Sequence, residues 1–156
     1  MFLDRDGVIN RKPADGEYIR SWEDFELIPS VVDWILLFNS LGLLVIVVTN
    51  QRGIARGLMQ QTDLTEIHDR MIMELNRRGA HIDDIFCCPH EENTCDCRKP
   101  KPGLVHQACQ KWDVDISRSV LIGDSDADRQ LAESCGLRFI HTREGRITAV
   151  CGSPVG

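Results

Sequence analysis

The chain has 156 residues, which is enough for one domain with its own hydrophobic core, and we expect residues 1–156 to form a single domain. Eighteen basic and 24 acidic side chains give a formal net charge of -6, which argues against a protein that binds nucleic acid through a broad basic face. Charged side chains from Asp4 onward argue against a secretory signal, and the longest apolar run, residues 41–48, is too short to cross a bilayer.

Short apolar runs alternate with helical periodicity along the chain, the pattern of an α/β fold with a parallel sheet. We expect the strands and helices in this order: a strand at 1–4, a helix at 30–40 capped by Ser30, a strand at 43–49, a helix at 62–78 capped by Thr62, strands at 84–88 and 120–123 flanking a helix at 102–112, a helix at 126–135, and a strand at 137–141. Residues 11–29 are polar and irregular and are interpreted as a flap over a site, and no element is expected after Thr142.

Polar side chains stand at the carboxyl ends of three expected strands. Asp4 and Asp6 follow the first strand, Thr49 and Asn50 end the second, and Asp124 ends the fourth. A parallel sheet brings these ends to one edge, where open α/β sheets bind ligands. Carboxylates with a hydroxyl and nearby cations suit magnesium-dependent phosphoryl transfer.

In such a site the residues would have unequal roles. Asp4 would attack the phosphorus atom, and the side chain of Asp6, kept off the metal, would protonate the leaving alkoxide and then activate water. Magnesium held by Asp4, Asp124 and a backbone carbonyl would offset the repulsion between carboxylate and phosphate, about 4 kcal/mol per charge pair at 4 Å in an effective dielectric near 20. Lys99 and the hydroxyl of Thr49 would bind the remaining phosphoryl oxygens.

Each of these signals is weak by itself. The pattern Asp-x-Asp-Gly also occurs in Asx-turns and in calcium loops, although Asn10 and the residues after it lack the further oxygen ligands that a calcium loop needs. The acidic run 124–128 could be a simple helix cap, and Lys99 alone could be a surface lysine. Their occurrence together, at successive strand ends of one chain, favours the phosphoryl-transfer site.

The runs FLDRDGVIN, VVTNQRGIARG, CDCRKPKPG and VLIGDSDAD resemble the four motifs of the haloacid dehalogenase (HAD) superfamily. They are most similar to its branch of D-glycero-D-manno-heptose 1,7-bisphosphate phosphatases and histidinol-phosphate phosphatases, over about residues 2–141. The resemblance implies a HAD-like Rossmannoid three-layer α/β fold with a central five-stranded parallel sheet, a zinc-stapled loop and no separate cap domain.

The resemblance also implies roles for individual residues. Asp4 is then the nucleophile that forms an aspartyl-phosphate, and Asp6 is the general acid/base that lends its backbone carbonyl to magnesium. Thr49 and Lys99 hold the phosphoryl group, and Asp124 completes the magnesium site. In the last motif Asp128, rather than Asp126, matches the second acid and is expected behind the metal ligands.

Four of the seven cysteines crowd into residues 87–97, which is poor evidence for a disulfide framework and better evidence for a metal in a reducing compartment, the cytoplasm. The spacing C-x-H…C-x-C predicts a closed, structural zinc site made by Cys88, His90, Cys95 and Cys97. Cys87 is a competing ligand, but it should point to the other face of its strand. The branch named above carries the same zinc loop, which would place Arg98 and Lys99 beside the phosphate.

Arg52, Arg56 and Arg98 are cations in an acidic chain and, with Asn50, are candidate substrate-binding residues. The alternative is that Arg52 and Arg56 are solvated loop residues. The run G-I-A-R-G resembles the heptose enzymes, whereas the short loop from His90 to Cys95 is nearer to the histidinol enzymes. Arg52 replaces the small residue that is usual at its position.

We therefore expect a magnesium-dependent phosphatase that acts on a small sugar phosphate, with the C7 phosphate of heptose 1,7-bisphosphate as the leading substrate, in heptose synthesis for cell-surface polysaccharide. Histidinol-phosphate phosphatase is an alternative that calls for an aromatic or acidic pocket. Polynucleotide 3′-phosphatase fits poorly with the net charge of -6. A non-catalytic zinc-stapled interaction module is the alternative of another class. We expect a monomer with no nucleic-acid or membrane partner.

Overall fold

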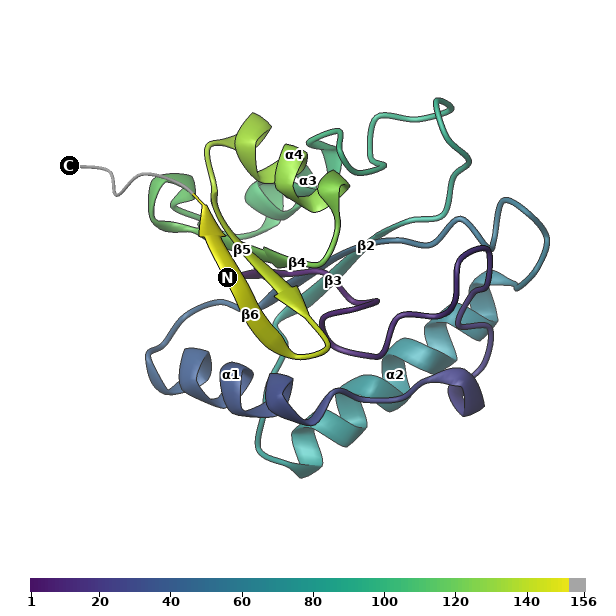
Figure 1. Ribbon diagram of the computed structural model, residues 1–156, viewed down its shortest axis with the longest axis horizontal. Helices are drawn as coiled ribbons and strands as arrows, with labels where there is room; N and C mark the ends of the chain where they lie inside the picture. The colour runs from purple at the N-terminus through teal and green to yellow at the C-terminus, as the bar shows by residue number, and fades with distance from the viewer. Residues whose placement is uncertain (152–156) are drawn as a thin grey trace.

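The structure is a computed structural model that describes residues 1–151 (Figure 1). Its strands and helices follow one another in the order β1 (Phe2–Leu3), α1 (Pro29–Ser40), β2 (Ile46–Asn50), α2 (Gln61–Arg77), β3 (Asp84–Cys88), α3 (Gly103–Lys111), β4 (Val120–Gly123), α4 (Asp126–Cys135), β5 (Arg138–Arg143) and β6 (Arg146–Cys151). Short 3₁₀ turns at Trp22–Asp24 and Ile116–Arg118 complete the elements.

The six strands form one sheet in the order β3-β2-β1-β4-β5-β6. β1 to β5 are parallel, as predicted, and β1 lies at the centre, with Leu3 beside Val47 of β2 and Ile122 of β4. All five parallel strands therefore end at one edge of the sheet, and the loops that follow them carry the candidate site.

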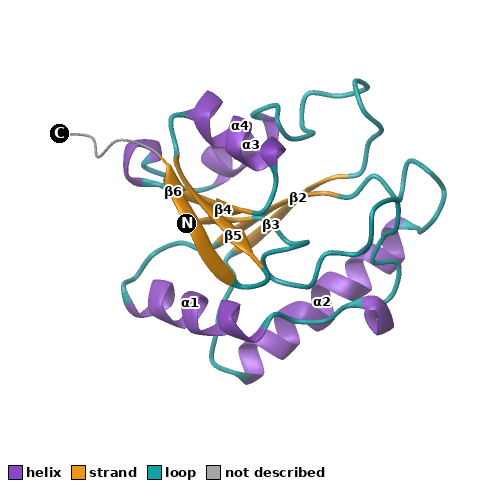
Figure 2. Ribbon diagram, viewed as in Figure 1, coloured by secondary structure: helices purple, strands orange, loops and turns teal. Residues whose placement is uncertain are grey.

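Helices cover both faces of the sheet, α1 and α2 on one side and α3 and α4 on the other (Figure 2). Each helix buries an apolar stripe: Ile67 and Met71 of α2 pack in one core, and Leu104 of α3 and Leu131 of α4 pack in the other. Successive strand residues point into opposite cores, which explains why the central strands read as continuous apolar runs. The predicted three-layer α/β fold is confirmed.

A sixth strand corrects the expectation that no element follows Thr142. β5 continues to Arg143, and Glu144 and Gly145 form a two-residue turn with φ values of 49° and 75°. Positive φ at both turn residues matches the right-handed twist of a hairpin, so β6 pairs antiparallel with β5. Every residue of β6 is exposed, which is why its sequence shows no buried apolar pattern.

Two predicted helix caps were also wrong. α1 begins at Pro29, and the hydroxyl of Ser30 donates to the carbonyl of Gly145 in the hairpin turn (2.9 Å) instead of capping the helix. α2 begins at Gln61, and Asp63, in its first turn, accepts a hydrogen bond from the backbone of Gln60 (2.7 Å). In both cases the helix starts one residue earlier than predicted. Pro29, which has no backbone N–H to satisfy, stands at the first position of α1, and Asp63 satisfies the backbone N–H of Gln60 at the start of α2.

None of the helices between residues 1 and 151 combines the length and the apolar character that crossing a bilayer requires.

Candidate active site

A cleft of about 310 Å³ opens at the carboxyl edge of the sheet. Its walls are the loops after β1, β2 and β4, the loop between β3 and α3, and residues 12–19 of the polar segment that was interpreted as a flap. The sequence-predicted residues that line it are Asp4, Asp6, Thr49, Asn50, Arg52, Arg98, Lys99 and Asp124. Arg56, predicted with them, is not among the lining residues.

Three carboxylates meet at the floor of the cleft. Asp4, Asp124 and Asp128 each offer an oxygen, and these oxygens lie within 4.8 Å of one another. One oxygen of Asp124, Oδ1, is buried and has no hydrogen-bond partner among residues 1–151, while Lys12 donates to the other (2.8 Å). A buried carboxylate oxygen without a partner is costly, so the geometry fits a divalent cation that these oxygens would bind.

Lys99 lies between two of these carboxylates. Its Nζ is 2.7 Å from Oδ1 of Asp4 and 2.6 Å from Oδ1 of Asp128, and its side chain is almost completely buried. Burial alone would lower the pKa of Lys99, but the charges of Asp128 and Asp4 outweigh it and raise the pKa, so the amine stays charged. Burial, with the charge of Asp128, raises the pKa of Asp4 to about 7. A bound divalent cation would favour the ionised carboxylate.

The carboxylate of Asp6 is held apart from this cluster. Arg5 donates to both of its oxygens, Asn10 donates to Oδ1 (2.9 Å), and Gln51 donates to Oδ2 (2.9 Å). Burial opposes the ionisation of Asp6, but the charge of Arg5 and these hydrogen bonds outweigh it and lower the pKa. Asp4 and Asp6, two residues apart, therefore sit in opposite electrostatic environments.

Two residues at the end of β2 serve different purposes. The hydroxyl of Thr49 accepts a hydrogen bond from the amide of Gln51 (2.9 Å), which leaves its own hydrogen free to be donated to a ligand. Asn50 forms two hydrogen bonds with the backbone of Lys99, one in each direction (3.1 and 3.0 Å). Asn50 thus ties the loop that carries Lys99 to the sheet, a role that its sequence position did not reveal.

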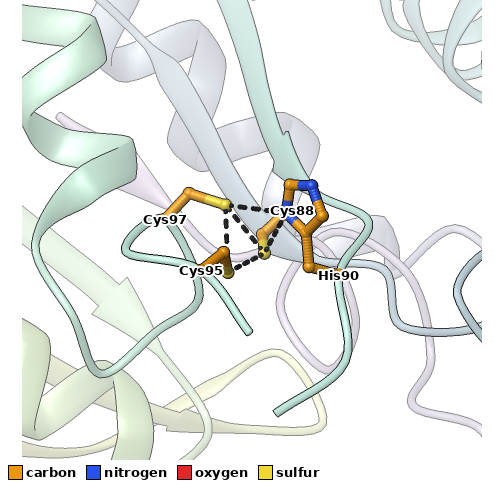
Figure 3. A group of neighbouring side chains, drawn as sticks. All are labelled: Cys88, His90, Cys95 and Cys97. Carbon is orange, nitrogen blue, oxygen red and sulfur yellow. Dashed lines mark hydrogen bonds between the residues drawn. The ribbon is translucent and has the colours of Figure 1, made fainter. Parts of the chain in front are cut away.

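Four metal-ligand side chains converge at the end of β3, which contributes Cys88, and in the loop between β3 and α3, which contributes the other three (Figure 3). The three sulfurs of Cys88, Cys95 and Cys97 are 3.0 to 3.5 Å apart, and Nδ1 of His90 lies 3.6 Å from Cys88 and 3.2 Å from Cys97. Tetrahedral zinc with Zn–S bonds of about 2.3 Å would place its sulfurs about 3.8 Å apart, so the cluster is close to the size that zinc needs. Cys87 instead packs into the core on the opposite face of the sheet.

The three arginines differ in what they contact. Arg52 donates to the Tyr18 hydroxyl (3.3 Å) and to the carboxylates of Glu91 (3.2 Å) and Glu92 (2.5 Å), and a second guanidinium, that of Arg56, also pairs with Glu91 (3.0 Å). These acids lie between the predicted zinc ligands and compensate the charge of both arginines.

Arg98 differs from the other two. It lines the cleft, and its Nη1 is buried without a hydrogen-bond partner in the described part of the chain. Its other terminal nitrogen is 3.6 Å from Glu92. Arg98 therefore has a free donor for a ligand.

Several side chains that build the site or contact its residues were not predicted from the sequence, namely Arg5, Asn10, Lys12, Tyr18, Gln51, Glu91 and Glu92. They are ordinary polar residues of loops or strand ends, and their partners lie in other loops, so no spacing within the sequence marks them. Arg5 is the clearest case, because an arginine beside two aspartates gives no sign that it is completely buried.

Gly7 brings the loop after β1 against Asp124. Its φ is 90°, and a Cβ added there would collide with the Asp124 carboxylate. We expect Gly7→Ala to displace this carboxylate and to weaken divalent-cation binding by about tenfold or more, measured by titration calorimetry. Gly42→Ala is the matched control, because Gly42 has a φ of 68° and open space around its Cβ position. Equal cation affinity in the two variants would contradict the assignment.

Comparison with known proteins agrees with this geometry. The HAD-hydrolase-like family model matches residues 96–150. Over 144 residues the chain is 40% identical to the D-glycero-beta-D-manno-heptose-1,7-bisphosphate 7-phosphatase of Rhodopseudomonas palustris, which covers 87% of this chain and 78% of the relative. The chain belongs to the HAD superfamily. The predicted superfamily is thereby confirmed.

Other HAD phosphatases show the same likeness. The D-glycero-alpha-D-manno-heptose-1,7-bisphosphate 7-phosphatase of Campylobacter jejuni is 40% identical over 130 residues, which cover 83% of this chain and 73% of that enzyme. The crystal structure of D,D-heptose 1,7-bisphosphate phosphatase from B. bronchiseptica, complexed with magnesium and phosphate, aligns with a TM-score of 0.83 at 35% identity, covering 89% of this chain and 77% of that one.

Proposed function

We propose that this HAD protein is a magnesium-dependent phosphatase that removes the C7 phosphate of D-glycero-D-manno-heptose 1,7-bisphosphate. The observation that carries the proposal is a buried oxygen of Asp124 that has no hydrogen-bond partner within residues 1–151. It lies beside Asp4 and beside Lys99, which pairs with both Asp4 and Asp128. This arrangement supplies a cation site, a nucleophile and a charged phosphate ligand in one cleft. The substrate is inferred from the relatives, which are named as heptose bisphosphate phosphatases of both anomeric types.

The residues of the chain would divide the reaction into two steps. Asp6 would take up a proton when the negatively charged substrate enters the cleft, because a nearby like charge raises the pKa of a carboxyl group. Asp4 attacks the phosphorus, the bond to the sugar oxygen breaks, and the protonated Asp6 gives its proton to that oxygen, which leaves an aspartyl-phosphate. Asp6 then takes a proton from water, which attacks the phosphorus and releases inorganic phosphate from Asp4. Lys99 and Thr49 hold the phosphoryl oxygens through both steps. Magnesium, held by Asp4, Asp124 and the backbone carbonyl of Asp6, would neutralise phosphate charge.

We further propose a structural zinc ion at Cys88, His90, Cys95 and Cys97. The distances among their four ligand atoms support it, and a site with four protein ligands leaves no open position for chemistry. The ion would hold the loop whose next two residues are Arg98 and Lys99. No disulfide joins any of the seven cysteines, all within the described residues, which supports the proposed location in the cytoplasm. The monomeric state and the single-domain organisation remain predictions.

The remaining phosphate of the substrate would be bound by Arg98. Arg98→Gln is expected to raise KM for heptose 1,7-bisphosphate about 10-fold to 100-fold, because a charge-assisted hydrogen bond to phosphate is lost, and to change KM for a heptose monophosphate much less. Steady-state kinetics with both substrates measure the difference. Arg77→Gln, at an exposed arginine of α2, is the control and should change neither KM. An equal rise in KM for the two substrates would show that Arg98 does not bind the remaining phosphate specifically.

The histidinol-phosphate alternative is not favoured by the cleft. One aromatic ring, that of Tyr18, lines the cleft, and two acids, Glu91 and Glu92, contact the lining residue Arg52, but all three side chains are engaged by Arg52. They are therefore not free to receive the cationic end of histidinol.

A substrate panel tests the proposal. Phosphate release with magnesium is measured for both anomers of heptose 1,7-bisphosphate, for histidinol phosphate and for a 3′-phosphorylated oligonucleotide. We expect kcat/KM to be highest, by at least about 100-fold, for one heptose anomer. A higher value for histidinol phosphate or for the oligonucleotide would reject the proposed substrate while keeping a phosphatase, and no release from any of them would reject both.

A further inference from the structure

Arg5 is the centre of a buried network of hydrogen bonds that includes Asp6, the candidate general acid. Its side chain is completely buried, and its Nε and Nη2 both donate to Asp6 at 2.9 to 3.1 Å. Nη2 also donates to Oε1 of Gln51 (3.1 Å), and the side-chain NH₂ group of Gln51 donates to Oδ2 of Asp6 (2.9 Å). Arg5, Asp6 and Gln51 thus form a closed ring of hydrogen bonds that fixes the direction of the Asp6 carboxylate.

A further hydrogen bond, the last that the guanidinium makes within residues 1–151, joins Arg5 to α2. Nη1 of Arg5 lies 3.2 Å from Nε2 of His68. Arginine has only donors, so Nε2 must be the acceptor, and His68 must be neutral with its proton on Nδ1. Burial and the charge of Arg5 lower the pKa of His68 to about 3, which agrees with a neutral ring at the pH of ordinary assays.

We propose that His68 is a positioning residue for the phosphatase reaction, which acts through Arg5 to aim the carboxylate of Asp6 at the leaving-group oxygen. Without an acceptor at Nε2, the Nη1 group of a fully buried arginine would lose its partner, and the guanidinium would turn to find another. The ring with Asp6 and Gln51 would turn with it. This inference rests on the proposed role of Asp6 as the proton donor.

Two variants separate the hydrogen bond from the bulk of the side chain. His68→Leu removes the acceptor and leaves a side chain of similar size that is apolar. His68→Gln instead places a carbonyl oxygen, which is an acceptor, near the position of Nε2. His106→Leu is the control, because His106 is an exposed histidine of a helix, α3, on the other face of the sheet.

The choice of substrate separates positioning from general damage. Heptose 1,7-bisphosphate and glycerol phosphate release an alkoxide, which needs a proton from Asp6. p-Nitrophenyl phosphate releases a phenolate that departs as a stable anion and needs no proton. Since kcat/KM reports the first chemical step, the two classes respond differently to a misplaced acid.

We expect His68→Leu to lower kcat/KM about tenfold for both alkyl phosphates and less than about twofold for p-nitrophenyl phosphate, and His68→Gln to recover most of the loss. An equal fall for all substrates, or no fall for any, would overturn the inference. If the wild type hydrolyses glycerol phosphate but not heptose 1,7-bisphosphate, the substrate proposal fails. The role of His68 is then still tested by comparing the loss of kcat/KM for glycerol phosphate with the loss for p-nitrophenyl phosphate.

A measurement without turnover checks the contact itself. Nitrogen NMR of the His68 ring should show a neutral imidazole protonated on Nδ1 from pH 8 down to about pH 5. Protonation of His68 with a midpoint near 6.5, the ordinary value for histidine, would overturn the inference whatever the kinetics show.

Discussion

Asp4→Asn is expected to reduce phosphate release from heptose 1,7-bisphosphate by at least about 10⁴-fold at saturating magnesium, because an amide does not form the aspartyl-phosphate that both steps require. Asp126→Asn is the matched control. Asp126 is an exposed acid that pairs with Arg129, and its loss should leave the rate near that of the wild type. Residual turnover of Asp4→Asn within about tenfold of the wild type would contradict the role of Asp4 as nucleophile.

The same variant should fold normally, and the difference between its thermal stability and that of the wild type should change with pH. The pKa of Asp4 is raised from 3.8 to about 7, so the folded state binds this proton more tightly than the unfolded state does. Ionisation of Asp4 therefore costs folding free energy as the pH rises from about 4 to 7. With magnesium chelated, Asp4→Asn lacks this cost and should gain thermal stability relative to the wild type between pH 5 and pH 8. A relative loss over that interval would contradict the raised pKa.

Cys97→Ser is expected to have the second large effect. It should reduce the zinc content from about one ion per chain to near zero, lower Tm by about 10 °C or more, and lower kcat/KM by about 100-fold or more. The reason is that Lys99 stands two residues from Cys97, in a loop that contributes few residues to either core. Metal analysis, thermal unfolding and steady-state kinetics measure the three effects on the same preparation.

The control for this variant is Cys151→Ser, at an exposed cysteine of β6 outside the cluster. It should keep the zinc, the Tm and the activity of the wild type. A Cys97→Ser protein with the full zinc content, or a wild-type protein that is folded and active without zinc, would contradict the structural zinc site.

Features with a local cause could be predicted from the sequence. The bounds of β3, β4 and α4 agree with the prediction, since β4 is a short, buried apolar run that ends at a glycine. Ser125 and Asp128 form a capping box, in which each side chain accepts a hydrogen bond from the backbone of the other, and this four-residue motif marks the start of α4. The polar residues at strand ends were predictable for the same reason, because a parallel sheet places every strand end at one edge.

Features that depend on distant partners could not be predicted. Nothing near Lys12 in the sequence indicates that it pairs with Asp124, 112 residues away, and nothing near Arg5 indicates His68, 63 residues away. Arg52 could be identified as a cation, but its neutralisation by Glu91 and Glu92 required the loop geometry. β6 was missed because an exposed strand carries no burial pattern, although the turn at Glu144 and Gly145 was a usable signal.

Phosphorus NMR of the wild type with magnesium and D-glycero-D-manno-heptose 1,7-bisphosphate shows which phosphate the protein removes. We expect the C7 phosphate signal to decay with equal growth of inorganic phosphate, the C1 phosphate signal to persist in the product, and the reaction to stop when magnesium is chelated. Loss of the C1 phosphate, or a spectrum that does not change with magnesium present, would contradict the proposed function.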